Sequence, residues 1–147
     1  MYWFANWIWG VPLIVLTVLI HSFALFAMHN RFVKMVERHS NDKSVRVTFP
    51  IFMGAAVLLV TVLLAAEAAI LGAAYLMLGA LPDSRSAILY SLNAMTTYGH
   101  ASLMLAPRWQ MLGALEALNG MILFGLTTAF LFTLLRRALE FGGTKSD

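Results

Sequence analysis

Charged residues are scarce in this chain, and cysteines are absent. Only 12% of its 147 residues are Asp, Glu, Lys or Arg, whereas 61% are hydrophobic, and none is cysteine. The chain therefore has no disulfide and no thiolate metal site. The composition is typical of an integral membrane protein. The net charge of +3 is small and the basic residues flank apolar runs, which fits membrane topology better than nucleic-acid binding.

The motifs of several functional classes are also missing. The sequence contains no phosphate-binding loop, nucleotide fingerprint or catalytic motif, so we do not expect an enzyme. The first apolar stretch has no arginine at every third position, so we do not expect a voltage sensor. Residues 1–30 carry no formal charge, and the basic start of a signal peptide is lacking.

Three long apolar stretches predict membrane-spanning helices. About 20 apolar residues are enough to cross a bilayer, and we place the spans at residues 7–28, 50–78 and 111–135. Pro50 suits the first turn of a helix. Gly79 and Pro82 end the second span. The fold class predicted is an all-α membrane protein with three transmembrane helices.

The distribution of Lys and Arg predicts the orientation. Residues 31–46 hold five of them and the C-terminal part from Arg136 holds three, whereas residues 79–110 hold only two. Basic residues concentrate on the cytoplasmic side. We therefore expect a multi-pass protein of the plasma (inner) membrane, with its N-terminus outside and its C-terminus in the cytoplasm.

Residues 91–102, SLNAMTTYGHAS, are too polar for a plain span, although residues 86–107 carry no formal charge. Hydrogen-bonding groups at membrane depth are tolerated only where protein or water covers them. Asp83 or Ser84 caps a helix that we place at residues 85–95, and its length of about 16 Å is half a bilayer. We predict a re-entrant segment between the second and third spans, not a fourth span.

The segment that follows this short helix resembles the selectivity filter of the potassium-channel family. The family's filter reads T-T-V-G-Y-G-D, and residues 96–102 read T-T-Y-G-H-A-S in the same frame. Both threonines and the first glycine match. Residues 119–129, NGMILFGLTTA, look like the family's inner helix, with Gly120 at its hinge position.

The resemblance implies the organisation of the chain. Residues 50–137 would form the pore domain, with an outer helix, a re-entrant pore helix and an inner helix. Residues 1–49 would add an extra transmembrane helix and a basic cytoplasmic connection. Residues 138–147 would form a short cytoplasmic tail. Independently of the resemblance, we expect Gly142, Gly143 and the polar residues after them to be frayed.

The function that the resemblance implies is passive conduction of monovalent cations, K⁺ or Na⁺, through a homotetrameric pore in the lipid bilayer. Carbonyls and threonine hydroxyls replace the water around the ion, and one loop supplies too few oxygens. No cofactor or resident metal is implied, since the cation binds only transiently. The predicted filter consists of Thr96, Thr97, Tyr98, Gly99, His100 and Ala101.

Ala101 stands where the family has its second glycine. A left-handed backbone costs a non-glycine residue about 1 kcal/mol or more. We therefore expect a degenerate filter that discriminates weakly between K⁺ and Na⁺.

Further residues of the pore domain are candidates for supporting roles. Phe124, Thr128 and Phe132 recur every four residues and would face one side of a helix. The resemblance implies that this side lines the cavity, with Phe132 as a hydrophobic constriction, and the alternative is ordinary packing. Carboxylates within a membrane are functional candidates. We expect Glu67 to lie behind the loop, near Asn93, Tyr98 or His100, or else to brace the bundle as a protonated or hydrogen-bonded carboxyl. We expect Glu116 near the outer end of the third span, where water reaches it, as an attractor of cations or a solvated helix-end charge.

Several alternatives stay open. The hydroxyls of Thr96 and Thr97 can bond to their own helix, and His100 fits an ordinary interfacial histidine. A second function is a non-conducting subunit of a larger complex with an unidentified membrane partner. His21 and His29 raise a third, a haem or quinone protein, but a spacing of eight leaves them about 80° apart around a helix. Core or capping roles suit them better.

Overall fold

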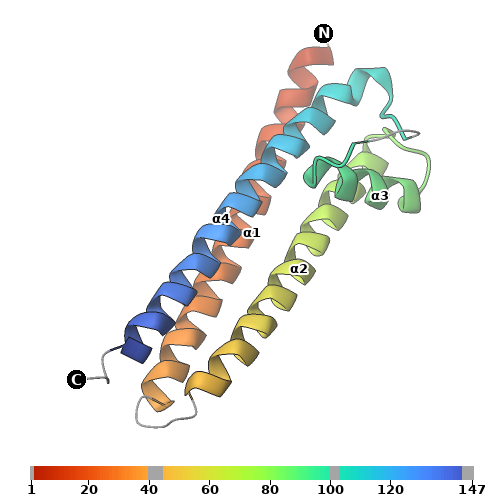
Figure 1. The fold of residues 1–147 in the computed structure, drawn as a ribbon. Coiled ribbons are helices and arrows are strands. Elements are labelled where there is room, and N and C mark those ends of the chain that lie inside the picture. The colour runs from red at the N-terminus through yellow and green to blue at the C-terminus, as the bar shows by residue number, and fades with distance from the viewer. Residues whose placement is uncertain (1, 40–44, 100–102, 144–147) are drawn as a thin grey trace.

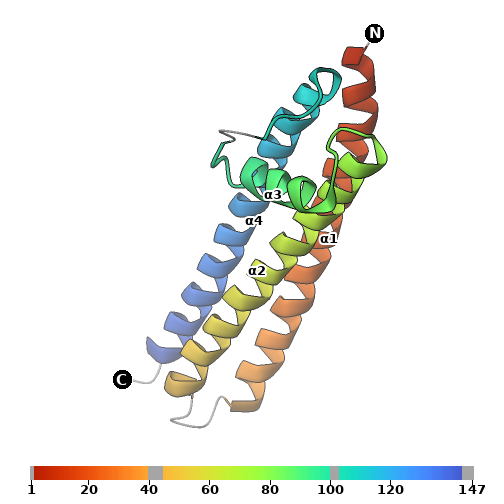
Figure 2. The ribbon, with the colours of Figure 1, turned by 90° about the vertical axis from the view of Figure 1, so that its right-hand side faces the viewer.

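The computed structural model describes residues 2–39, 45–99 and 103–143, and all their regular secondary structure is helical. The helices are α1 (Tyr2–His39), α2 (Val45–Met77), α3 (Ser84–Met95) and α4 (Gln110–Gly143), and the short 3₁₀ turn η1 (Pro107–Trp109) leads into α4. The long helices α1, α2 and α4 form a bundle, and the short α3 lies across it near one end (Figures 1 and 2).

Three helices contain segments that are long and apolar enough to cross a membrane, namely Trp3–Met35, Phe49–Met77 and Pro107–Arg137. Large apolar side chains cover the outside of the bundle. Phe4 is 74% exposed and Phe23 is 72% exposed. Apolar surface of this extent is a membrane-facing surface rather than a water-facing one. The chain is therefore an all-α, multi-pass membrane protein, as predicted.

The long helices extend further than predicted. α1 continues past residue 28 through Arg31 and Lys34, because long basic side chains reach water while their backbone stays helical. α2 begins before Pro50, which removes only one hydrogen bond near the helix start. α4 does not stop at Arg136 but runs on to Gly143, so a frayed end at Gly143 was a wrong prediction. Residues 144–147 lie outside the described residues.

The predicted signals between α2 and α3 are confirmed. Gly79 has φ +60°, its N–H donates to the carbonyl of Leu76, and the N–H of Ala80 donates to that of Tyr75. These bonds form a Schellman motif that closes α2. Asp83 caps α3, since its Oδ1 accepts the backbone N–H of Ser86 at 2.9 Å. That bond holds the pKa of the exposed Asp83 carboxyl below its usual range.

Glycines on both neighbours let α3 pack closely between α2 and α4. A Cβ at Gly72 of α2 would lie 3.2 Å from the carbonyl carbon of Ala87, and one at Gly120 of α4 would lie 2.7 Å from that of Met95. Gly120 lies about 20 Å along the helix axis from Pro107, where the third apolar segment begins. The end of α3 thus reaches the middle part of that segment, which is the re-entrant geometry that the sequence predicts.

The basic residues of the spanning helices gather at one end of the bundle. Arg31 and Lys34 lie in the last turns of α1, and Arg136 and Arg137 lie in the last turns of α4, at the end opposite to α3 (Figure 1). The chain runs up and down through the antiparallel α1 and α2, so the start of α1 and the connection between α2 and α4 lie at the same end (Figure 1). The arrangement agrees with a three-span topology.

The close approach of α4 to α3 predicts opposite effects for two glycines of α4. Gly120→Ala should lower the free energy of unfolding by about 1–3 kcal/mol, because its Cβ would overlap the backbone of Met95. Gly125→Ala is the matched control, since a Cβ there meets nothing within 4 Å and alanine favours a helix over glycine. Thermal unfolding of the detergent-purified variants measures both. Equal melting temperatures would contradict the contact.

Candidate functional site

The segment that follows α3 is left uncovered by its own chain. Residues 96–99 are all exposed, and Tyr98 is 85% exposed. The backbone turns through positive φ at Thr97 (54°) and at Gly99 (87°). The other two predicted filter residues, His100 and Ala101, lie outside the described residues. The described part of the predicted filter is thus free to contact another molecule.

Hydrogen bonds from this segment close the end of α3. The N–H of Thr97 donates to the carbonyl of Ala94, and the N–H of Tyr98 donates to that of Asn93, both at 3.0 Å. This is a Schellman motif with Thr97 at the position that usually holds glycine. A left-handed backbone costs a residue with a Cβ about 1–2 kcal/mol, and such strain gathers at functional sites. No pattern in the sequence marked Thr97 as left-handed.

The hydroxyl of Thr96 bonds to its own helix, which was one of the alternatives. Its Oγ1 donates to the carbonyl of Leu92 at 2.8 Å, and it lies 3.3 Å from that of Asn93. The oxygen keeps lone pairs that can accept a further bond or contact a cation. Asn93 itself is half-buried on α3.

Glu116 lies behind α3 and not in water. It is 3% exposed, and its carboxylate accepts hydrogen bonds from the hydroxyls of Ser91 on α3 and Tyr75 on α2. A carboxylate is tolerated in an apolar interior only when such bonds satisfy it. The prediction that bulk solvent reaches Glu116 is wrong, because α3 folds back over this part of α4. Glu116 occupies the supporting position that we expected for Glu67.

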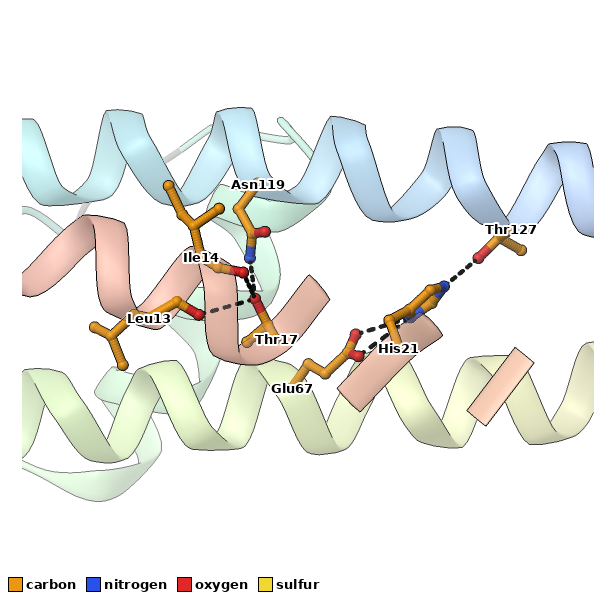
Figure 3. Close-up of polar contacts among 7 residues, drawn as sticks. All are labelled: Leu13, Ile14, Thr17, His21, Glu67, Asn119 and Thr127. Carbon is orange, nitrogen blue, oxygen red and sulfur yellow. Dashed lines mark hydrogen bonds and ion pairs between the residues drawn. The ribbon is translucent and has the colours of Figure 1, made fainter. Parts of the chain in front are cut away.

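Glu67 forms a buried contact deeper in the bundle, with His21 (Figure 3). Nδ1 of His21 lies 3.1 Å from Oε1 of Glu67, and its Nε2 lies 2.9 Å from Oγ1 of Thr127. Both His21 and Glu67 are 0% exposed. The contact joins α1, α2 and α4, so Glu67 braces the bundle through a hydrogen bond, which was the alternative to a position behind the loop. The signal available in the sequence was a histidine within an uncharged span.

The position of His21 also bears on the haem hypothesis. Both of its ring nitrogens contact protein side chains, which disfavours a role as an axial ligand. Among residues 2–39, 45–99 and 103–143, no group of three or more His, Asp or Glu side chains could hold a metal ion.

Two further polar contacts tie α1 to α4. The amide Nδ2 of Asn119 donates to Oγ1 of Thr17 at 2.9 Å, and that hydroxyl bonds to carbonyls of its own helix (Figure 3). Near the start of α1, Nδ2 of Asn6 donates to the carbonyl of Arg108, and its Oδ1 accepts the N–H of Leu112. Sequence reasoning missed these residues, because isolated polar residues in apolar spans do not reveal their partners.

The predicted lining residues of α4 lie on its outward face. Phe124, Thr128 and Phe132 are exposed, whereas Leu123 and Leu134 are 0% exposed in the bundle interior. The stripe is therefore not packed within its own chain. Gly120 lies elsewhere, buried against α3, so packing accounts for this glycine and its hinge role stays a prediction.

No family of known proteins, no curated protein and no solved structure matches this chain. The geometry of the site and the resemblance in the sequence are therefore the grounds for a function.

The contact between His21 and Glu67 predicts different stabilities for a single and a double variant. His21→Leu should lower the free energy of unfolding by about 1–3 kcal/mol, because the buried Glu67 carboxyl loses its partner. The double variant His21→Leu, Glu67→Leu should recover part of this loss, since replacing both polar partners by apolar groups is close to neutral. Thr61→Val is the control, because its exposed hydroxyl bonds to the carbonyl of Val57 on its own helix. A double variant less stable than the single one would contradict the pairing.

The backbone at Thr97 predicts a gain in stability. Thr97→Gly should raise the free energy of unfolding by about 1 kcal/mol, because glycine adopts positive φ without a steric penalty. Thr96→Gly is the matched control and should lower it, since Thr96 has φ −84° and its hydroxyl bonds to the helix. Thermal unfolding in the same detergent ranks the two variants. A destabilised Thr97→Gly protein would exclude the left-handed conformation.

Proposed function

We propose that this chain is the subunit of a homotetrameric membrane pore for monovalent cations, with residues 96–101 at its narrowest part. The observation that carries this proposal is the re-entrant α3. Its end lies against Gly120 of α4, within the membrane-spanning part of the bundle. The threonine and glycine residues that follow it are exposed in the single chain. Four copies around one axis would cover this segment and supply enough oxygens to replace the water around an ion.

The electrostatics of α3 favour a cation at its end. A helix carries about half a negative charge at its C-terminus, and the 12 residues of α3 direct that end toward residues 96–99. The carboxylate of Glu116 holds α3 from behind through Ser91. We expect weak selectivity for K⁺ over Na⁺, because Ala101 replaces a glycine of the family's filter.

The outward stripe of α4 supports the same arrangement. Phe124, Thr128 and Phe132 would line the cavity below the filter, and Phe132, 64% exposed in the single chain, would form a hydrophobic constriction. The basic ends of α1 and α4 would face the cytoplasm of the cell, with the N-terminus and the re-entrant segment outside.

One observation favours a second candidate, a channel-like subunit that does not conduct. The carbonyls of Leu92, Asn93 and Ala94 already accept hydrogen bonds from residues 96–98. These carbonyls are therefore satisfied without an ion. Such a subunit would use the exposed segment to pack against a partner in the membrane.

Ion flux from proteoliposomes distinguishes the two candidates. For a cation pore we expect K⁺ and Na⁺ flux and a bi-ionic reversal potential close to zero. Thr97→Ala should reduce the flux several-fold, because it removes a hydroxyl from the proposed filter. Thr61→Ala is the matched control, since that exposed threonine lies on α2 and its hydroxyl bonds to the carbonyl of Val57 on the same helix.

Three outcomes would change this proposal. Absence of flux from a protein that crosslinks as a tetramer would favour the non-conducting subunit. A stable monomer in a bilayer would remove the basis for a central pore. A strongly K⁺-selective reversal potential would contradict the expectation for Ala101.

A further inference from the structure

A small cavity lies inside the bundle between α1, α2 and α4. Its volume is about 10 Å³, which is room for one water molecule. Three of its lining residues carry polar side chains, namely Tyr75, Glu116 and Asn119. The rest of the lining, including Gly10 and Leu71, is apolar.

Asn119 lines this cavity and carries an unsatisfied polar atom. The residue is 0% exposed, and its Nδ2 donates to Thr17. Within the part of the chain that the structure describes, its Oδ1 has no hydrogen-bond partner. Buried side-chain oxygens are bonded to protein or to ordered water in the large majority of native structures.

Glu116 also lines the cavity, and its carboxylate has acceptor capacity left. Its Oε1 accepts from Ser91 and its Oε2 from Tyr75. Each carboxylate oxygen has two lone pairs, so each can accept a second hydrogen bond. Two acceptors on a common cavity need a molecule with two donors, and water has two.

We propose that this cavity binds a water molecule that donates one hydrogen bond to Oδ1 of Asn119 and one to the carboxylate of Glu116. Two hydrogen bonds lie within the usual range of about two to four for buried water. Tyr75, whose hydroxyl donates to Glu116, lines the same cavity. A dehydrated cation would need more oxygen ligands than these side chains offer.

The water completes a hydrogen-bonded chain from α3 to α1. Ser91 bonds to Glu116, the water joins Glu116 to Asn119, and Asn119 bonds to Thr17. α1 lies outside the pore-like part of the sequence. Through this chain of hydrogen bonds it helps to position the re-entrant helix α3. This inference stands whether or not the protein conducts ions.

Radiolytic labelling in ¹⁸O-water tests the site on the full-length protein in detergent. A bound water forms a hydroxyl radical that oxidises the side chain beside it, and mass spectrometry locates the label. We expect label on Tyr75, although it is only 2% exposed. Leu134, in the apolar cluster at the other end of the bundle, should remain unlabelled. Asn119→Leu should reduce the Tyr75 label several-fold, and Thr133→Val, on the same helix but outside the cavity, should not.

A double-mutant cycle tests the chain itself without altering the cavity lining. Thr17→Val and Ser91→Ala remove its two ends, and we expect their shifts in melting temperature to be non-additive. Thr17→Val combined with Thr133→Val should be additive. An unlabelled Tyr75 in folded wild-type protein, an equal label in Asn119→Leu, or an additive Thr17 and Ser91 pair would overturn the proposal. If NaCl raises the melting temperature and choline chloride does not, the cavity binds a cation and not water. That result would also overturn the proposal.

Discussion

The carboxylate of Glu116, held by the hydroxyls of Tyr75 and Ser91, is the interaction around which the re-entrant part of the protein is arranged. It brings one polar group from each of α2, α3 and α4 to a common point away from solvent. An ionisable group at such depth must have partners, since unsatisfied polar groups are costly in an apolar surrounding. The same bonds that satisfy Glu116 hold α3 against the bundle, where Gly72 and Gly120 allow it to pack closely.

The polar contacts that α1 makes with the other long helices lie toward its N-terminal end, beside apolar clusters. Toward the N-terminal end, α1 meets its neighbours through polar contacts at Asn6, Thr17 and His21. Toward the other end, the helices meet in an apolar cluster that includes Phe32 and Leu134. Polar contacts require defined partners and geometry, so they fix the rotation of the helices where α3 is attached. The apolar end needs only complementary volume.

The end of α3 combines two tendencies that bear on function. Its helix dipole and the threonines beside it suit a cation, yet its last carbonyls already bond to residues 96–98. Thr97 holds this arrangement at a cost in backbone strain. This strained turn satisfies the end of α3 within one copy of the chain. Assembly with other copies, or a change of conformation, can rearrange it. The conducting and non-conducting proposals differ in whether that rearrangement takes place.

The sequence was sufficient for the features that depend on hydropathy and on neighbours a few residues away. The three spans, the Gly79 turn, the Asp83 cap and the short helix after it belong to this class, because local backbone bonding and the cost of exposing polar groups to lipid decide them. The ends of the long helices were placed less well, since basic side chains let a helix leave the membrane without stopping.

Only the tertiary structure decided which buried groups meet. Glu67 pairs with His21, 46 residues away on another helix, and Glu116 rather than Glu67 supports α3. Such pairings depend on how each helix is rotated and crossed against its neighbours, and three-dimensional packing alone sets those angles.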